Sequence, residues 1–237
     1  MHRITVSGIE VEVVRKGIKN LHVGVYPPDG RVRVAAPLLV DDDAVRLAVV
    51  TRLDWVKRQR ARFQAQERQS AREYVDRESH YFQGRRYLLK IIEADGPSRV
   101  VLRNSAMELH VPKGADAERR ERVMSQWYRR ELRASAAPLV EKWSERLGVV
   151  VDEVRIKRMR TKWGSCNPQA NRVWLNLELA KKPPHCLEYV VVHELVHLLE
   201  KSHNATFQAL MDENMPEWRL YRDELNRKPL AHEDWRT

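Results

Sequence analysis

The chain has 237 residues, of which 43% are apolar and 32% are charged. This composition predicts a folded globular protein and excludes wholesale disorder. No apolar run approaches the ~18 residues that a membrane helix needs, and two cysteines, Cys166 and Cys186, are too few for a disulfide scaffold. The first six residues lack the apolar core of a signal peptide, so a cytoplasmic location without membrane association is expected. The net charge of +10 points only weakly to nucleic acid as a partner, because an arginine-rich composition alone produces it.

Residues 1–113 are predicted to form a β-rich region with one long helix. The alternation of apolar residues predicts strands at 9–13, 21–25, 31–34, 81–82, 87–92, 99–103 and 107–111. The first three strands are expected to form a hairpin or meander. Asp41-Asp42-Asp43 opens the helix, whose apolar positions run from Val45 to Phe63. No internal repeat is evident.

Residues 114–237 are predicted to form the catalytic region, either as a second domain or as part of one compact unit. Asp116 opens a long helix that ends at Gly148, and Pro138 is expected to kink it or split it. The later elements are predicted strands at 154–159 and 172–177 and helices at 186–199, 205–211 and 217–225. The expected fold class is therefore α+β.

The segment His193-Glu194-Leu195-Val196-His197 carries the chemistry. Histidines at positions i and i+4 lie one above the other on a helix face and can hold one metal ion. Glu194 projects from the side of the helix next to the histidine face, where it can deprotonate a metal-activated water. The surrounding residues are apolar, so the helix is expected to be buried, and buried imidazoles and carboxyls need partners. The weaker interpretation is a pair of core histidines bonded to backbone carbonyls beside a salt-bridged Glu194.

A catalytic zinc ion needs a third protein ligand and one open position. His203, six residues after the motif, is the preferred third ligand, and Glu200 and Asp212 are the carboxylate alternatives. Ser202 or Asn204 can cap the next helix, which favours a bend that brings His203 back toward the motif. Three neutral imidazoles suit Zn2+ better than calcium or magnesium.

The sequence resembles the YgjP-like metallopeptidases, zincin-like proteins related to the SprT and WLM-type proteases. Four segments carry the resemblance in the family's order and spacing, over roughly 154–226: Trp163–Cys166, Asn171–Leu177, Leu187–His197 and His203–Phe207. The resemblance implies a zincin-like fold with an HExxH active-site helix. It also implies that His193, His197 and His203 bind zinc and that Glu194 is the general base.

Two segments before the motif have no single interpretation. Trp163-Gly164-Ser165-Cys166 is favoured as a buried turn braced by the tryptophan, and the alternatives are a Cys166 thiolate ligand or a site of Cys166, Cys186 and His185. The second segment is a run of five cations, which form either a solvated strand face or an electropositive rim of the cleft. They are Arg155, Lys157, Arg158, Arg160 and Lys162.

The sequence therefore predicts a zinc-dependent metallopeptidase that hydrolyses peptide or protein substrates. Candidates for stabilising the oxyanion are Arg160, Lys162 and Tyr189. The strand at 172–177 is expected to form the cleft edge and to bind substrate by β-augmentation. One alternative is a SprT- or WLM-like protease that acts on DNA-bound proteins, and another is a basic binding module with only structural zinc. Glu194 argues against the last, because a structural site needs no water-activating carboxylate.

Overall fold

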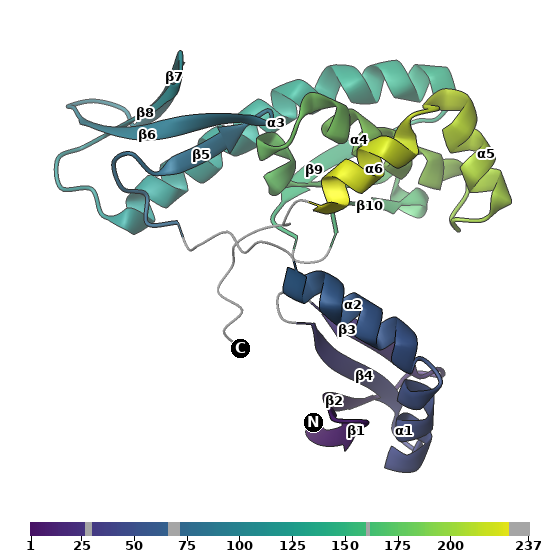
Figure 1. Cartoon of the computed structure of the whole chain (residues 1–237). Coiled ribbons are helices and arrows are strands. Elements are labelled where there is room, and N and C mark those ends of the chain that lie inside the picture. Colours follow the sequence, from purple (N-terminus) through teal and green to yellow (C-terminus); the bar gives the residue numbers. More distant parts are fainter. Residues whose placement is uncertain (27–29, 66–71, 160–161, 228–237) are drawn as a thin grey trace. The chain divides into compact units, whose positions relative to one another are not determined.

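The computed structural model describes residues 1–26, 30–65, 72–159 and 162–227, in a mixed α+β fold (Figure 1). Its described residues divide into two compact units, 1–26 with 30–65, and 72–159 with 162–227. Leu89 and Leu109 share one core with Leu132 and Leu195, so the expected division between residues 113 and 114 falls inside the second unit. A separate catalytic region of 114–237 stays a prediction. None of the helices in the described ranges is long and apolar enough to cross a bilayer.

The first unit contains a four-stranded sheet and two helices. The strands are β1 (His2–Val6), β2 (Ile9–Lys16), β3 (His22–Tyr26) and β4 (Arg31–Pro37). The three predicted strands are confirmed, and β1 was missed. The predicted hairpin is confirmed for β3 and β4, which pair in antiparallel orientation. A meander of all three strands is wrong, because β4 lies between β2 and β3 and pairs with β2 in parallel. Buried valines such as Val11 and Val34 form the core of this unit.

Two helices stand where one was predicted, namely α1 (Asp42–Val50) and α2 (Leu53–Ala65). The start is as expected, because the Asp41 carboxylate accepts a hydrogen bond from the Ala44 N–H at 2.8 Å. α1 ends at Thr51, whose hydroxyl donates to the Leu47 carbonyl at 2.7 Å. Such a bond to the carbonyl four residues back often accompanies a bend in a helix.

The second unit begins with a sheet that repeats the topology of the first. Its strands are β5 (Ser79–Phe82), β6 (Arg85–Glu93), β7 (Arg99–Arg103) and β8 (Ala106–Val111), as predicted. The order β5-β6-β8-β7 and the parallel β6–β8 pair match β1-β2-β4-β3 and the parallel β2–β4 pair. The first hairpin turns also match, because Ser7 and Gly8 (φ 49° and 75°) correspond to Gln83 and Gly84 (φ 48° and 79°). A structural repeat is therefore present, although none was expected.

A single long helix, α3 (Ala117–Leu147), follows the repeat and runs along both the β5–β8 sheet and α4 (Figure 1). Both predicted ends are confirmed. The Asp116 carboxylate accepts from the Arg119 N–H at 2.7 Å, and Gly148 is left-handed with φ 64°. The helix is not split at Pro138.

The remaining elements surround the candidate site. They are β9 (Glu153–Lys157), β10 (Gly164–Asn167), β11 (Arg172–Asn176), α4 (Pro184–Leu199), α5 (Ala205–Asn214) and α6 (Trp218–Arg227), with short 3-10 helices η1 (Pro168–Ala170) and η2 (Leu177–Lys181). The sheet order is β10-β11-β9. The predicted cleft edge at 172–177 is therefore wrong: β11 is the central strand, paired on both sides, and β10 is an edge strand.

Candidate metal centre and active site

The helix α4 places two histidines on one face and then ends, so that the chain can return. The rings of His193 and His197 are 4.8 Å apart between centroids. The helix ends at its C-cap residue, Glu200, whose backbone is extended (φ −135°). The Asn204 side chain caps α5 by accepting from the Phe207 N–H at 3.0 Å. This turn brings His203 back to the first two histidines.

The three imidazoles converge through their Nε2 atoms. The Nε2 of His203 lies 3.0 Å from that of His197 and 3.1 Å from that of His193. Zinc–nitrogen bonds of about 2.0–2.1 Å in a tetrahedral site place ligand nitrogens about 3.3 Å apart, so this arrangement fits a zinc ion closely. Burial, with the neighbouring His197, lowers the pKa of His193 to about 3 and also lowers that of His203. Neutral rings are the form that binds a metal.

Contacts behind the rings orient them. The Nδ1–H of His197 donates to the Glu200 carbonyl at 3.0 Å, which leaves the Nε2 lone pair free for a metal. The Tyr189 hydroxyl lies 3.5 Å from the Nδ1 of His193, which is a long contact. Phe207 is 1% exposed, and its ring centroid lies 4.7–5.0 Å from those of all three histidines. It forms the apolar floor of the cluster.

The carboxylate alternatives for the third ligand are engaged elsewhere. Asp212 accepts from the Trp218 indole N–H at 2.7 Å and pairs with Arg219. The Glu200 carboxylate accepts from the Ser202 N–H at 3.0 Å. In the described part of the chain, the only histidine-rich cluster of potential ligands is that of His193, His197 and His203.

Glu194 lies in the same cavity with its carboxyl almost buried. Glu194 is 5% exposed, and burial raises the pKa of its carboxyl to about 8. The positive charge of Lys162 partly opposes this rise in pKa. The cavity has a volume of about 530 Å³ and is bounded by β10, α4, α6 and residues 201 and 203. Both Glu194 and the three histidines line it, together with Tyr189.

Residues 164–166 lie in strand β10 and Trp163 is a bend before it, so the predicted buried turn is wrong. Gly164 begins β10 and packs against Glu194, while Lys182 lies over the Trp163 ring at 5.2 Å. Burial and the Glu194 carboxylate raise the pKa of Cys166 to about 11, so its thiol stays protonated at neutral pH. The proposed cluster of Cys166, Cys186 and His185 is not formed; His185 and Cys186 lie beside Glu224 instead.

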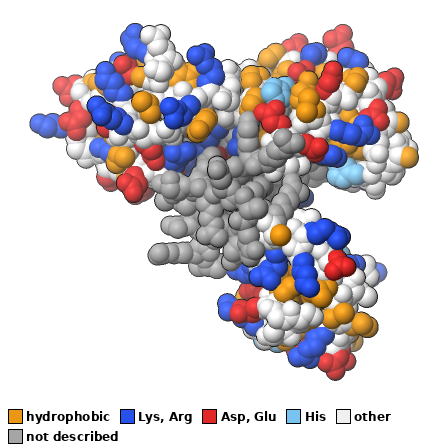
Figure 2. All heavy atoms as spheres, viewed as in Figure 1, with side chains coloured by type: hydrophobic (Ala, Val, Ile, Leu, Met, Phe, Trp, Pro, Cys, Tyr) orange, Lys and Arg blue, Asp and Glu red, His pale blue; other side chains and the backbone are white. Residues whose placement is uncertain are grey.

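The run of cations before β10 is mostly bound away from the cavity. Arg155 pairs with Glu153, Lys157 lies over the Trp174 ring, and Arg158 donates to Glu121 and Ser125. These contacts of Arg155, Lys157 and Arg158 favour the interpretation as a solvated strand face over that as an electropositive rim of the cleft. On the face drawn in Figure 2, cations and acids are interspersed.

Two of the three candidates for stabilising an oxyanion line the cavity, namely Lys162 and Tyr189. The third, Arg160, lies outside the described residues. Burial raises the pKa of Tyr189 to about 12, so its hydroxyl remains a hydrogen-bond donor.

Sequence reasoning missed two residues that hold this site together. Phe207 was seen only as part of a family segment, and its apolar position in α5 was the available signal. Asn176 is 0% exposed, and its amide donates to the Met159 and Lys162 carbonyls at 2.8 Å each. Nothing in the local pattern distinguishes it from a surface asparagine.

A family model for the YgjP-like metallopeptidase domain matches residues 20–228. The chain belongs to this family. The YgjP-like assignment confirms the resemblance found in the sequence, and it makes the protein a metallopeptidase by family. A comparison with curated proteins found no significant match.

Two solved metallopeptidase zymogens are similar to parts of this YgjP-like chain. Abylysin of Pyrococcus abyssi is 18% identical over 40% of this chain and 98% of its own, with a TM-score of 0.37. Jannalysin of Methanocaldococcus jannaschii is 21% identical over 38% of this chain and 91% of its own, with a TM-score of 0.34. The family assignment rests on the family model alone.

Proposed function

We propose that this protein is a zinc-dependent peptidase in which His193, His197 and His203 hold the metal and Glu194 is the general base. The main support is that the Nε2 atoms of His197 and His193 lie 3.0 and 3.1 Å from that of His203, beside a buried carboxyl in one cavity. A bound zinc ion would polarise the substrate carbonyl and lower the pKa of a water in its open position.

Glu194 is suited to moving the proton. Beside a divalent cation, the pKa of its carboxyl would fall from about 8, since a positive charge favours the ionised form. The carboxylate would accept a proton from the attacking water and deliver it to the leaving amine. Tyr189 and Lys162 line the same cavity and are the available donors for the developing oxyanion.

The edge strand β10 is the element best placed to align a peptide. One side pairs with β11, and residues 164–166 also line the cavity. An extended substrate that added to the unpaired side would place a backbone carbonyl near Glu194. The role predicted for residues 172–177 is thereby transferred to β10.

The rival functions have less support. A structural-zinc module would not need a buried carboxyl in an open 530 Å³ cavity beside the ligands. A DNA-directed protease is motivated by the net charge of +10 alone.

An unbiased peptide-library digest tests the proposal. The zinc-loaded protein should cleave a defined set of peptides, and a chelator should abolish cleavage until zinc is restored. Absence of cleavage by protein that carries zinc would contradict the peptidase function.

A further inference from the structure

Gly164 lies against the carboxyl group of Glu194. A β-carbon built on Gly164 would stand 2.5 Å from Oε1, 2.7 Å from Cγ and 2.8 Å from Cδ of Glu194. Unlike Gly30 or Gly84, Gly164 does not have a positive φ, so its backbone conformation is open to any residue. The need for glycine at this position therefore comes from the neighbouring side chain.

The backbone at Gly164 is held firmly from the other side. Gly164 pairs with Leu175, which is 0% exposed, in the β10–β11 ladder. The Asn176 N–H donates to the Trp163 carbonyl at 2.9 Å, and the Asn176 amide donates to the Lys162 carbonyl at 2.8 Å. These bonds hold the two residues before Gly164 and, with the ladder, oppose any retreat of β10 from α4.

The Glu194 side chain is the more flexible of the two partners in this contact. The three Glu194 atoms that a β-carbon would meet belong to the end of an unbranched side chain whose carboxyl faces the cavity. An added methyl group would therefore displace the carboxyl, by about 1 Å if ordinary carbon contacts of about 3.5 Å are restored. The helix and the strand would stay in place.

We propose that Gly164 is a positioning residue for the general base, because the missing side chain leaves the space in which the Glu194 carboxylate sits. The inference rests on the proposed role of Glu194. It also assigns a function to the segment Trp163–Cys166, which the sequence alone left without one.

Gly164→Ala tests the inference through kinetics. A misplacement of about 1 Å in an active site lowers turnover about 10²-fold, so kcat should fall by about that factor, with KM and zinc content little changed. Gly17→Ala is the matched control, because a β-carbon there meets nothing within 4 Å and its φ is ordinary. An unchanged kcat in Gly164→Ala would overturn the inference while leaving the proposed function intact.

A double-mutant cycle identifies the contact. Glu194→Asp shortens the side chain by one methylene and withdraws the carboxyl from Gly164. In that background Gly164→Ala should cost much less activity than it does beside Glu194, since the two changes act on one contact. Equal losses in both backgrounds would contradict the inference.

Two further measurements do not depend on activity. A crystal structure of Gly164→Ala should show the Glu194 carboxyl displaced with β10 unmoved, and the reverse would overturn the inference even if wild type proved inactive. If Gly164→Ala fails to fold, adding Glu194→Ala should restore folding, because it removes the atoms that clash. Failure to restore it would also count against the contact.

Discussion

Asn176 is expected to stabilise the active-site sheet more than any other single polar side chain in it. The residue is fully buried at the end of β11. Its amide nitrogen donates to the Met159 and Lys162 carbonyls at 2.8 Å each. Its Oδ1 accepts from the Glu178 N–H at 3.2 Å and from the Met159 N–H at 3.4 Å. Asn176→Ala would leave these backbone groups without their partner.

The magnitude follows from these bonds. Each hydrogen bond contributes about 1 kcal/mol net, and a buried group left unsatisfied costs about 1–3 kcal/mol. Four lost bonds, two of them long, predict a destabilisation of about 2–4 kcal/mol. Asn176→Asp should be at least as severe, because it keeps the acceptor, loses both donors and sets a carboxylate oxygen against two carbonyl oxygens.

Urea unfolding of the full chain measures the loss, and hydrogen exchange of 162–167 localises it. Those amides should exchange faster in both Asn176 variants, and peptidase activity should fall because β10 positions Glu194. Asn167→Ala is the matched control, since its side chain accepts only from the Gln169 N–H at 3.1 Å. A change below about 0.5 kcal/mol in Asn176→Ala, the range of neutral surface substitutions, would show that these bonds do not stabilise the sheet.

Three other predictions follow from the site. Zinc-reconstituted protein should hold about one zinc per chain. His203→Ala should weaken zinc binding, and a loss of zinc in Asp212→Ala instead would show that His203 is not the third ligand. Because the pKa of Cys166 is about 11, iodoacetamide should modify it slowly at pH 8 in the metal-free native protein and faster as the pH rises toward 11, whereas alkylation as fast as that of a free thiol would contradict this. Lys162 and Lys201 line the cavity, so changing both to Gln should raise KM for acidic peptides and flatten its salt dependence, and an unchanged salt dependence would remove them from substrate binding.

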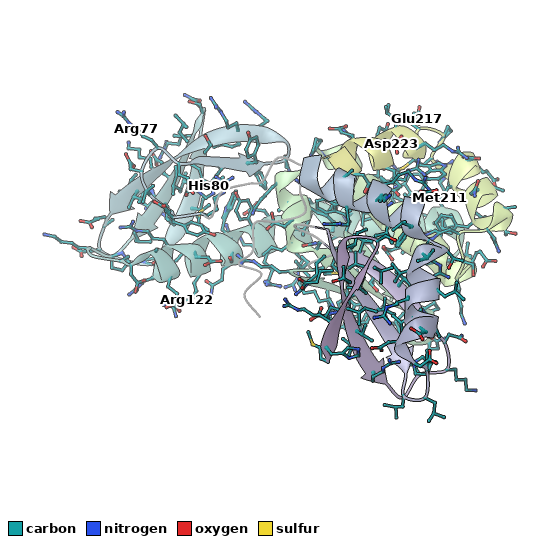
Figure 3. All side chains as sticks on the ribbon, turned by 60° about the horizontal axis from the view of Figure 1, so that its bottom comes forward. Arg77, His80, Arg122, Met211, Glu217 and Asp223 are labelled. Atoms are coloured by element: carbon teal, nitrogen blue, oxygen red, sulfur yellow. The ribbon has the colours of Figure 1, made fainter. Side chains whose placement is uncertain are left out.

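The cavity has one further cation, Arg222, whose charge is shared with a neighbour. It pairs with Asp223 at 3.0 Å and lies over the Trp218 ring at 5.0 Å. Figure 3 labels Asp223 on α6, and also Met211 on α5. The two lysines, not Arg222, therefore carry the prediction for acidic substrates.

The parts of the fold that were predicted correctly depend on local signals. The α4 motif, the caps at Asp41 and Asp116 and the end at Gly148 are each set by residues within a few positions. His203 was also predictable, because a helix end followed by a cap implies a chain reversal. Its identity as a zinc ligand stays a prediction.

The parts that were missed depend on contacts between distant segments. Gly164 lies against Glu194, which is 30 residues later in the sequence. Asn176, which follows β10, bonds to carbonyls of residues that precede β10. The insertion of β4 between β2 and β3 likewise depends on pairing, which alternation alone does not reveal. The structural repeat was hidden for a related reason. Its two copies share turns and strand order, while many different apolar residues satisfy the same strand pattern.

In the proposed function, Glu194 moves the proton without binding the metal. Glu194→Gln keeps the size of the side chain and removes its basicity, so the variant separates proton transfer from metal binding. The variant should retain zinc at the wild-type ratio and keep its fold, while hydrolysis falls by ~10²-fold or more, the scale of general acid–base catalysis. Near-normal hydrolysis by a zinc-loaded Glu194→Gln protein would contradict the account.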